Sequence, residues 1–126
     1  TISECPASFT LYGDYCFENS DATRRNQSTA SAYCAALSAM LPYPEGRLED
    51  WQKVIGKAIP SAWVWNPWSG AKLQSGGWLW PDGTVVLDSA WGIGEPHGSG
   101  SCSFVQFNGL LYDASCSWTY PVICQG

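Results

Sequence analysis

The stretch CSFVQFNGLLYDASCSWTYPVIC, residues 102–124, says most about the fold. Apolar and polar residues alternate over 102–107, which predicts a strand. Asn108-Gly109 favours a tight hairpin turn, after which 110–112 return as a second strand. Another short strand is expected over 118–124. The C-terminal end is therefore expected to consist of short antiparallel strands, and three cysteines lie among them.

The segment before this stretch also lacks a helical pattern. Residues 63–65 and 78–80 are each predicted to be a short strand, joined by a Gly/Ser-containing connection over 68–77. Pro81-Asp82-Gly83 predicts a turn, because proline presets φ and glycine accepts a positive φ, and 84–87 continue that hairpin. Residues 91–101 form a glycine-rich loop that contains the only histidine of the chain.

The N-terminal half carries the helices. Residues 5–17 predict a hairpin around the turn Gly13-Asp14. Apolar residues at helical spacing predict a first helix from Ser28, with Ser28 or Thr29 as N-cap and its end before Pro42. An apolar stripe over 48–59 predicts a second helix that Pro60 stops. A hairpin, two helices and then many short strands define an α+β fold.

Length and composition predict one folded domain over residues 1–126. Hydrophobic residues make up 45% of the chain, which excludes disorder, and no apolar run is long enough to cross a membrane. All six cations lie before position 73, so the C-terminal half cannot form a basic patch for nucleic acid. No N-terminal stretch has the pattern of a signal peptide, so a secreted chain would be in its mature form here.

The six cysteines predict an extracellular, secreted protein. None of their spacings is C-x-x-C, so a zinc knuckle or a thioredoxin-type site is not expected. Three disulfides formed in an oxidising compartment are the simplest interpretation, with 15 connectivities open. Asn26-Gln27-Ser28 is a glycosylation sequon, which agrees with secretion.

A series of short motifs resembles a known family when it is taken in chain order. The landmarks are Cys5-Pro6, Gly13-Asp14-Tyr15-Cys16-Phe17, Tyr33-Cys34-Ala35-Ala36-Leu37, Trp63-Val64-Trp65-Asn66, Trp80-Pro81-Asp82-Gly83, Trp91, Gly94-Glu95-Pro96, Cys102, Asp113-Ala114-Ser115-Cys116 and Pro121-Val122-Ile123-Cys124. Their order and spacing resemble the long form of the C-type lectin-like domain over residues 5–124. The resemblance implies the disulfides Cys5–Cys16, Cys34–Cys124 and Cys102–Cys116, with a long loop region between the last strands.

The resemblance also implies a sugar site around a calcium ion held by oxygen ligands. Glu95-Pro96, with Pro96 as the cis proline, and Asp113 match the family pattern and are the expected metal ligands. His97 replaces an Asn or Asp, Tyr112 replaces an Asn, and no carboxylate precedes Cys102. Two of five expected ligand positions are therefore kept, so a calcium site would be weak or absent.

Three hypotheses follow from this site. In the first, the domain is a lectin that binds a glycan through Glu95, His97, Tyr112 and Asp113, with Tyr112 or Trp118 stacking on the sugar. In the second, the same loops bind a protein or another surface, such as ice or a mineral, without calcium. In the third, Glu95, His97 and Asp113 hold zinc. The fourth interpretation is structural: the two acids cap loop backbone, and His97 is merely exposed.

Catalysis is not expected, because no nucleophile-elbow motif is present and the family is non-catalytic. Six of the eight tryptophans fall into two groups. Trp51, Trp63, Trp80 and Trp91 occupy landmark positions and are expected in the core. Trp65 and Trp68 are either a binding or self-association platform or a cover for a small core.

Overall fold

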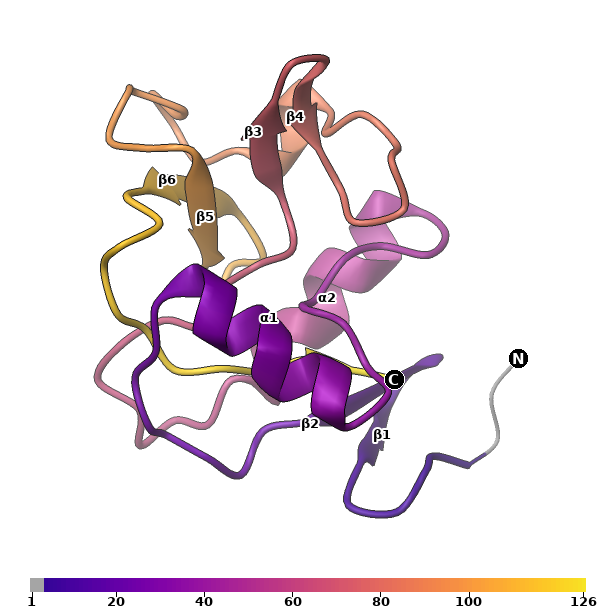
Figure 1. The fold of residues 1–126 in the computed structure, drawn as a ribbon. Helices are drawn as coiled ribbons and strands as arrows, with labels where there is room; N and C mark the ends of the chain where they lie inside the picture. Colours follow the sequence, from indigo (N-terminus) through magenta and orange to yellow (C-terminus); the bar gives the residue numbers. More distant parts are fainter. Residues whose placement is uncertain (1–3) are drawn as a thin grey trace.

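A computed structural model describes residues 4–126, and the first three residues of the expected domain lie outside the described residues. At one end of the molecule is a three-stranded antiparallel sheet of β1 (Thr10–Tyr12), β2 (Tyr15–Glu18) and β7 (Cys124–Gln125), in the order β1-β2-β7 (Figure 1). The predicted hairpin is confirmed, with Tyr12 opposite Tyr15 across the turn. This sheet brings both ends of the described chain to the same side (Figure 1).

Two helices lie between this sheet and the rest of the chain (Figure 1). α1 (Gln27–Ala36) begins at Asn26, whose side chain accepts a hydrogen bond from the Thr29 backbone N–H. The N-cap is therefore Asn26, and the helix ends before Leu37 because Ser38 takes a positive φ of 56°. α2 (Leu48–Ala58) buries Trp51, Ile55 and Ala58 on one face.

The opposite end holds two short hairpins, β3 (Lys72–Gln74) with β4 (Gly77–Leu79), and β5 (Cys102–Val105) with β6 (Leu111–Ala114) (Figure 1). A short 3-10 helix, η1 (Asp88–Ala90), leads into the long loop. The pairing predicted around Asn108-Gly109 is confirmed, with Phe104 opposite Tyr112.

Three expected strands differ from the structure. Residues 118–123 contribute only an isolated bridge between Tyr120 and Arg25, and β7 begins at Cys124. Residues 63–65 form no strand: the Trp63 N–H bonds to the Pro60 carbonyl and closes a turn, and Val64 and Trp65 follow as a bend, because prolines at 60 and 67 break the extended chain. β3 lies inside the expected 68–77 connection. It was not predicted, because its residues are all exposed and show no alternating pattern. Residues 84–87 contribute only one isolated bridge, Leu79 to Val85.

The disulfide pairing implied by the resemblance is confirmed: Cys5–Cys16, Cys34–Cys124 and Cys102–Cys116. Cys34–Cys124 joins residues 90 positions apart and ties α1 to β7. In the chain-entropy model a loop of this length stabilises the fold by about 4–5 kcal/mol. The shorter bridge Cys102–Cys116 closes the strands that carry the candidate site.

Two hydrophobic clusters make up the core. One contains Trp51, Trp80 and Trp91, and the half-buried Trp63 packs against it, as expected for the landmark tryptophans. The other surrounds the Cys34–Cys124 bridge and includes Trp68, which is fully buried. The structure therefore places Trp68 in the core, whereas Trp65 is 48% exposed.

Candidate functional site

The glycine-rich loop after Trp91 is anchored at both ends. Trp91 forms a bridge to Leu111 on β6, and the Gly92 N–H donates to the Leu111 carbonyl at 3.0 Å. At the other end, the Leu73 N–H donates to the Ser101 carbonyl at 2.7 Å, just before Cys102 and its disulfide. The loop therefore starts and ends on the framework of the two upper hairpins (Figure 1).

Glu95 connects this loop to β6. The Glu95-Pro96 peptide bond is cis, as the sequence predicts. The Glu95 side chain points inward, and its Oε1 accepts a hydrogen bond from the Asp113 backbone N–H at 3.0 Å. Only 10% of the Glu95 side chain is exposed. The two acids that the sequence singles out are therefore brought together, although 18 positions separate them.

Asp113 lies on β6, and its carboxylate is buried beneath the loop. Its Oδ1 accepts from the His97 N–H at 3.2 Å, and its Oδ2 accepts from Gly98 at 2.8 Å and Ser99 at 2.7 Å. Three consecutive backbone N–H groups thus converge on one buried charge. This explains why a carboxylate is tolerated at this depth.

His97 bridges the two acids. Its Nδ1 is 2.6 Å from Glu95 Oε2 and 2.9 Å from Asp113 Oδ1. Because both neighbours are carboxylates, which only accept hydrogen bonds, Nδ1 carries the proton. On the other side of the ring, Nε2 is 2.5 Å from the Ser99 hydroxyl. The imidazole thereby closes the cluster, while 56% of its side-chain surface stays exposed.

The contacts of Asp113 also determine its pKa. Burial raises the pKa of this carboxyl, but the hydrogen bonds that it accepts from the backbone N–H groups of His97, Ser99 and Gly98 outweigh burial. The pKa of Asp113 therefore lies below its ordinary value of 3.8. Asp113 is a carboxylate at neutral pH.

The cluster does not fit a calcium ion. A carboxylate has about four lone-pair positions, and those of Asp113 are taken by three backbone N–H groups and the His97 ring. Glu95 keeps two of its own positions, since the Asp113 N–H and His97 use the others. Calcium takes six to eight oxygen ligands, far more than this cluster leaves available.

The same distances argue against a zinc ion between these residues. Glu95, His97 and Asp113 each bring a ligand atom within 4.8 Å of the others, as the zinc hypothesis requires. Two ligands of tetrahedral zinc, however, lie about 3.3 Å apart when each is about 2 Å from the metal. The His97 nitrogen is closer than that to both acids. The group is closed by its own hydrogen bonds.

The two aromatic residues expected at the sugar site differ in position. Tyr112 stacks on Phe104 with ring centroids 5.6 Å apart, and its ring packs so closely over Gly92 that a Cβ there would overlap it. Tyr112 therefore supports the start of the loop. Trp118 is 48% exposed and lines a separate groove with Trp65 and Arg24.

Sequence reasoning missed Ser99. Its hydroxyl contacts the His97 imidazole and its N–H donates to the Asp113 carboxylate, so Ser99 connects these two residues. The sequence signal for this contact is the position of Ser99 two residues after His97 in a glycine-rich loop, where a turn can bring the hydroxyl back to the imidazole.

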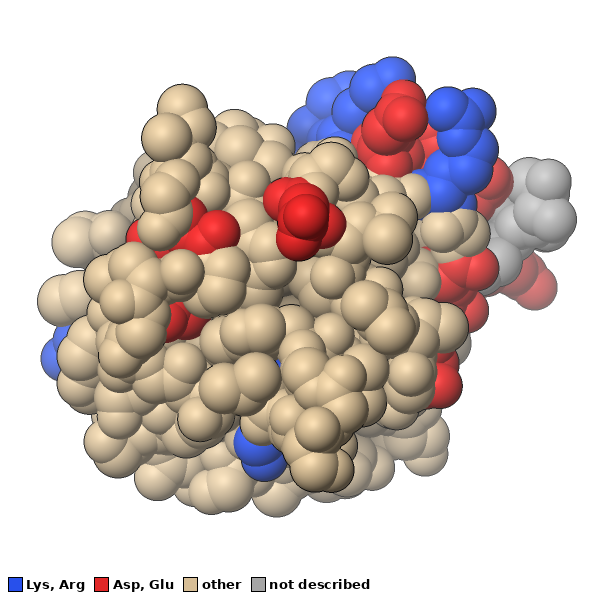
Figure 2. All heavy atoms as spheres, turned by 90° about the horizontal axis from the view of Figure 1, so that it is seen from above, with Lys and Arg blue, Asp and Glu red and all other residues tan. Residues whose placement is uncertain are grey.

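Charge is sparse on the face that carries this loop. Figure 2 looks onto the end with β3, β4 and the long loops, where most of the surface belongs to uncharged residues. The largest group of Lys and Arg lies at one edge together with acidic residues, while smaller basic spots and separate acidic patches lie elsewhere in this view (Figure 2). The sequence agrees, since no Lys or Arg follows Lys72. The uncharged surface includes exposed apolar side chains, such as Ile93 in the long loop and Leu73 on β3.

The fold is an α+β domain stabilised by three disulfides. A family model described as Lectin C-type domain matches residues 23–126, and the chain belongs to this family of C-type lectin domains. C-type lectin domains often bind calcium, but calcium-independent members exist, and the family is generally non-catalytic.

Solved structures with the same fold cover nearly the whole chain. The carbohydrate-recognition domain of the mouse scavenger receptor C-type lectin is 24% identical, with a TM-score of 0.80, and 98% of each chain is covered. A calcium-independent type II antifreeze protein is 27% identical, with a TM-score of 0.79 and coverage of 98% of this chain and 94% of that one. The murine dendritic cell inhibitory receptor 2 domain, solved in complex with N-glycan, is 18% identical, with a TM-score of 0.80 and 98% of each chain covered.

Among residues 4–126, no helix is both long and apolar enough to cross a membrane.

Proposed function

We propose that this domain, taken over residues 1–126, is an extracellular, non-catalytic lectin that binds glycan hydroxyls at the Glu95-Pro96-His97 loop without calcium. The observation that supports this proposal is the closed cluster, in which His97 lies between the Glu95 and Asp113 carboxylates. A loop already fixed by its own hydrogen bonds is preorganised and needs no ion to order it.

The loop keeps polar groups for sugar hydroxyls. Glu95 retains two acceptor positions, and the Ser99 hydroxyl lies at the rim beside the exposed imidazole. Relatives of this fold include the N-glycan complex named above. Three disulfides are consistent with an extracellular location.

The test is a glycan array read in calcium and again in excess EDTA. We expect the same glycans to bind in both buffers, and we expect calcium to leave the melting temperature unchanged, because a ligand stabilises a protein only by binding its native state. Signal that disappears with EDTA would contradict calcium independence.

A pair of variants assigns the signal to the loop. His97→Ala removes an exposed ring at the centre of the cluster, so glycan binding should fall at least tenfold. Lys57→Ala, exposed on α2, is the matched control and should bind like the parent. Equal binding by both variants would place recognition elsewhere.

The alternative is calcium-independent binding of a protein or other surface by the same loops. The antifreeze protein is calcium-independent and 27% identical to this chain, and most of the surface of the loop face belongs to uncharged residues (Figure 2). An array without signal in either buffer, together with thermal hysteresis in solution, would favour an ice surface over a glycan.

A further inference from the structure

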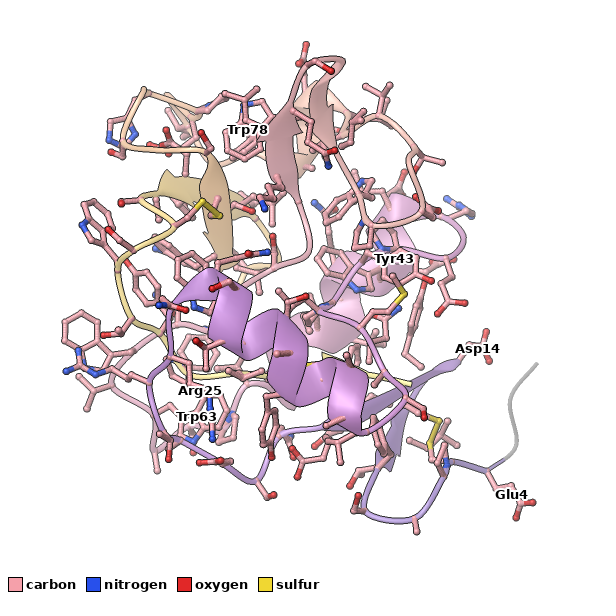
Figure 3. All side chains as sticks on the ribbon, viewed as in Figure 1. Glu4, Asp14, Arg25, Tyr43, Trp63 and Trp78 are labelled. Carbon is pink, nitrogen blue, oxygen red and sulfur yellow. A yellow bond between two sulfur atoms is a disulfide. The ribbon has the colours of Figure 1, made fainter. Side chains whose placement is uncertain are left out.

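A second candidate site lies on another part of the surface. It is a groove lined by Arg24, Trp65, Ser117, Trp118, Thr119 and Tyr120, which we call the Arg24 groove. It shares no residue with the loop that carries Glu95 and His97. Figure 3 shows the neighbouring Arg25 on the segment before α1, well away from Trp78 at the end with β3 and β4.

The floor of the groove is rigid. Arg25 and Tyr120 exchange two backbone hydrogen bonds of 2.9 and 3.0 Å, which hold residue 24 beside the 117–120 segment. The Tyr120 ring rests against the buried Trp68 indole at a centroid distance of 4.8 Å. That indole donates to the Arg25 carbonyl at 2.7 Å. The groove is therefore built on the core around Trp68.

The two adjacent arginines have different roles. Arg25 is tied to Asp21 by an ion pair at 3.2 Å and lies over the Tyr33 ring. Arg24 lies over the exposed Trp65 ring at 4.6 Å, and within residues 4–126 no carboxylate forms an ion pair with it. Stacking on an indole holds the guanidinium while its N–H edge stays free for a planar anion.

The remaining wall is aromatic and hydroxylated. Trp118 is 48% exposed, and Ser117 and Thr119 flank it. An exposed indole offers a flat apolar face for the C–H face of a sugar ring, and nearby hydroxyls suit the ring's own hydroxyls. The residues lining the groove bring one cation and no acid, in a chain with a net charge of −5.

We propose that the Arg24 groove binds a uronic acid residue of an acidic glycan. The sugar carboxylate pairs with the Arg24 guanidinium, whose fork matches a carboxylate in a bidentate arrangement. The pyranose ring stacks on Trp118, and Trp65 is a positioning residue that holds Arg24. This site goes beyond the function proposed for the Glu95 loop and does not depend on it.

The test is a titration of the whole domain with a hexasaccharide of alternating glucuronic acid and N-acetylglucosamine. The neutral hexamer of N-acetylglucosamine is the matched probe, and the indole N–H resonances report contact with tryptophan. We expect the acidic probe to shift the Trp65 and Trp118 resonances, and we expect its affinity to fall as salt is added. Arg24→Gln and Trp118→Ala should each lower the affinity for the acidic probe at least tenfold.

Two control variants match the charge and the aromatic surface removed. Arg47→Gln removes an exposed arginine beside Glu49, and Phe107→Ala removes an exposed ring elsewhere. Both should bind like the parent. All four positions are at the surface, so unchanged backbone spectra are expected to establish folding.

Three results would overturn the proposal: equal binding of the neutral hexamer, unchanged affinity in Arg24→Gln, or binding of sialyllactose in place of the glucuronate probe. His97→Ala separates the two sites, because it should leave the acidic probe bound at the Arg24 groove. Loss of that probe in His97→Ala, with retention in Arg24→Gln, would assign it to the Glu95 loop instead.

Discussion

At the residue scale, Asp113 orders the candidate site. Its buried carboxylate gathers three backbone N–H groups and faces the imidazole of His97. The family resemblance predicts Asp113 as a metal ligand, and in the structure its carboxylate is the acceptor on which the loop closes. The same residue type serves both roles because a carboxylate offers only acceptors, whether the partner is an ion or an N–H group.

Replacing Asp113 by Asn should destabilise the domain. The new amide keeps one acceptor oxygen and turns an NH₂ donor towards backbone donors, so we expect a loss of about 2–4 kcal/mol in unfolding free energy. Urea denaturation measures it. Asp88→Asn is the control, because that side chain is exposed and forms no hydrogen bond in the described part of the chain. A loss for Asp113→Asn as small as that of the control would show that the loop holds without this carboxylate.

At the element scale, glycine lets α2 approach the β5–β6 turn. A Cβ on Gly56 would lie 2.1 Å from the Phe107 carbonyl oxygen, and one on Gly109 would lie 2.5 Å from the Gln52 carbonyl oxygen. The helix backbone thus packs directly on the hairpin that carries Asp113. Because only glycine allows so close an approach of the two backbones, this contact sets the position of β6 relative to the helical half of the molecule.

Gly56→Ala should therefore destabilise the protein even though alanine favours helix formation by about 1 kcal/mol. Overpacking against a backbone oxygen is expected to cost about 1–3 kcal/mol overall. Gly46→Ala is the matched control, since its Cβ would meet no atom within 4 Å. Thermal unfolding of both variants measures the difference, and a Gly56→Ala protein as stable as the parent would refute the close packing.

At the scale of the whole molecule, one buried and three half-buried tyrosines link stability to alkaline pH. Burial raises the pKa values of Tyr15, Tyr33, Tyr43 and Tyr120 above the ordinary value of 10.0. Tyr15 also accepts a hydrogen bond from the Glu45 N–H at 3.0 Å, which joins β2 to the segment before α2. The neutral phenols are therefore part of the native packing.

The free energy of unfolding should fall as the pH rises above about 10. A raised native pKa means that the unfolded tyrosines lose their protons first, so this stabilisation is complete below the unfolded pKa and is lost towards the native one. Denaturation curves between pH 8 and 11 measure the slope. Tyr15→Phe should have a shallower slope, and an identical slope would show that Tyr15 ionises alike in both states.

The sequence predicted more of the fold than of the site. The N-terminal hairpin, both helices and the Asn108-Gly109 hairpin follow from patterns within a few residues of each other. β3 was not predicted, because all three of its residues are exposed and show no alternation. The strand predicted over 63–65 was wrong, because the flanking prolines favour turns. The sequence named Glu95, His97 and Asp113 as one group, but it did not predict the hydrogen bonds that close the group, because these join residues up to 18 positions apart.

The sequence by itself determined the order of elements, the disulfide-rich class and, through its motifs, the resemblance to C-type lectins. Those properties depend on local periodicity, turn chemistry and spacing along the chain. Only the tertiary structure decided that His97 bridges Glu95 and Asp113, and that Arg24 shares a groove with Trp118. Both sites join segments from separate elements, and packing of those elements fixes the distances on which hydrogen bonds and ion coordination depend.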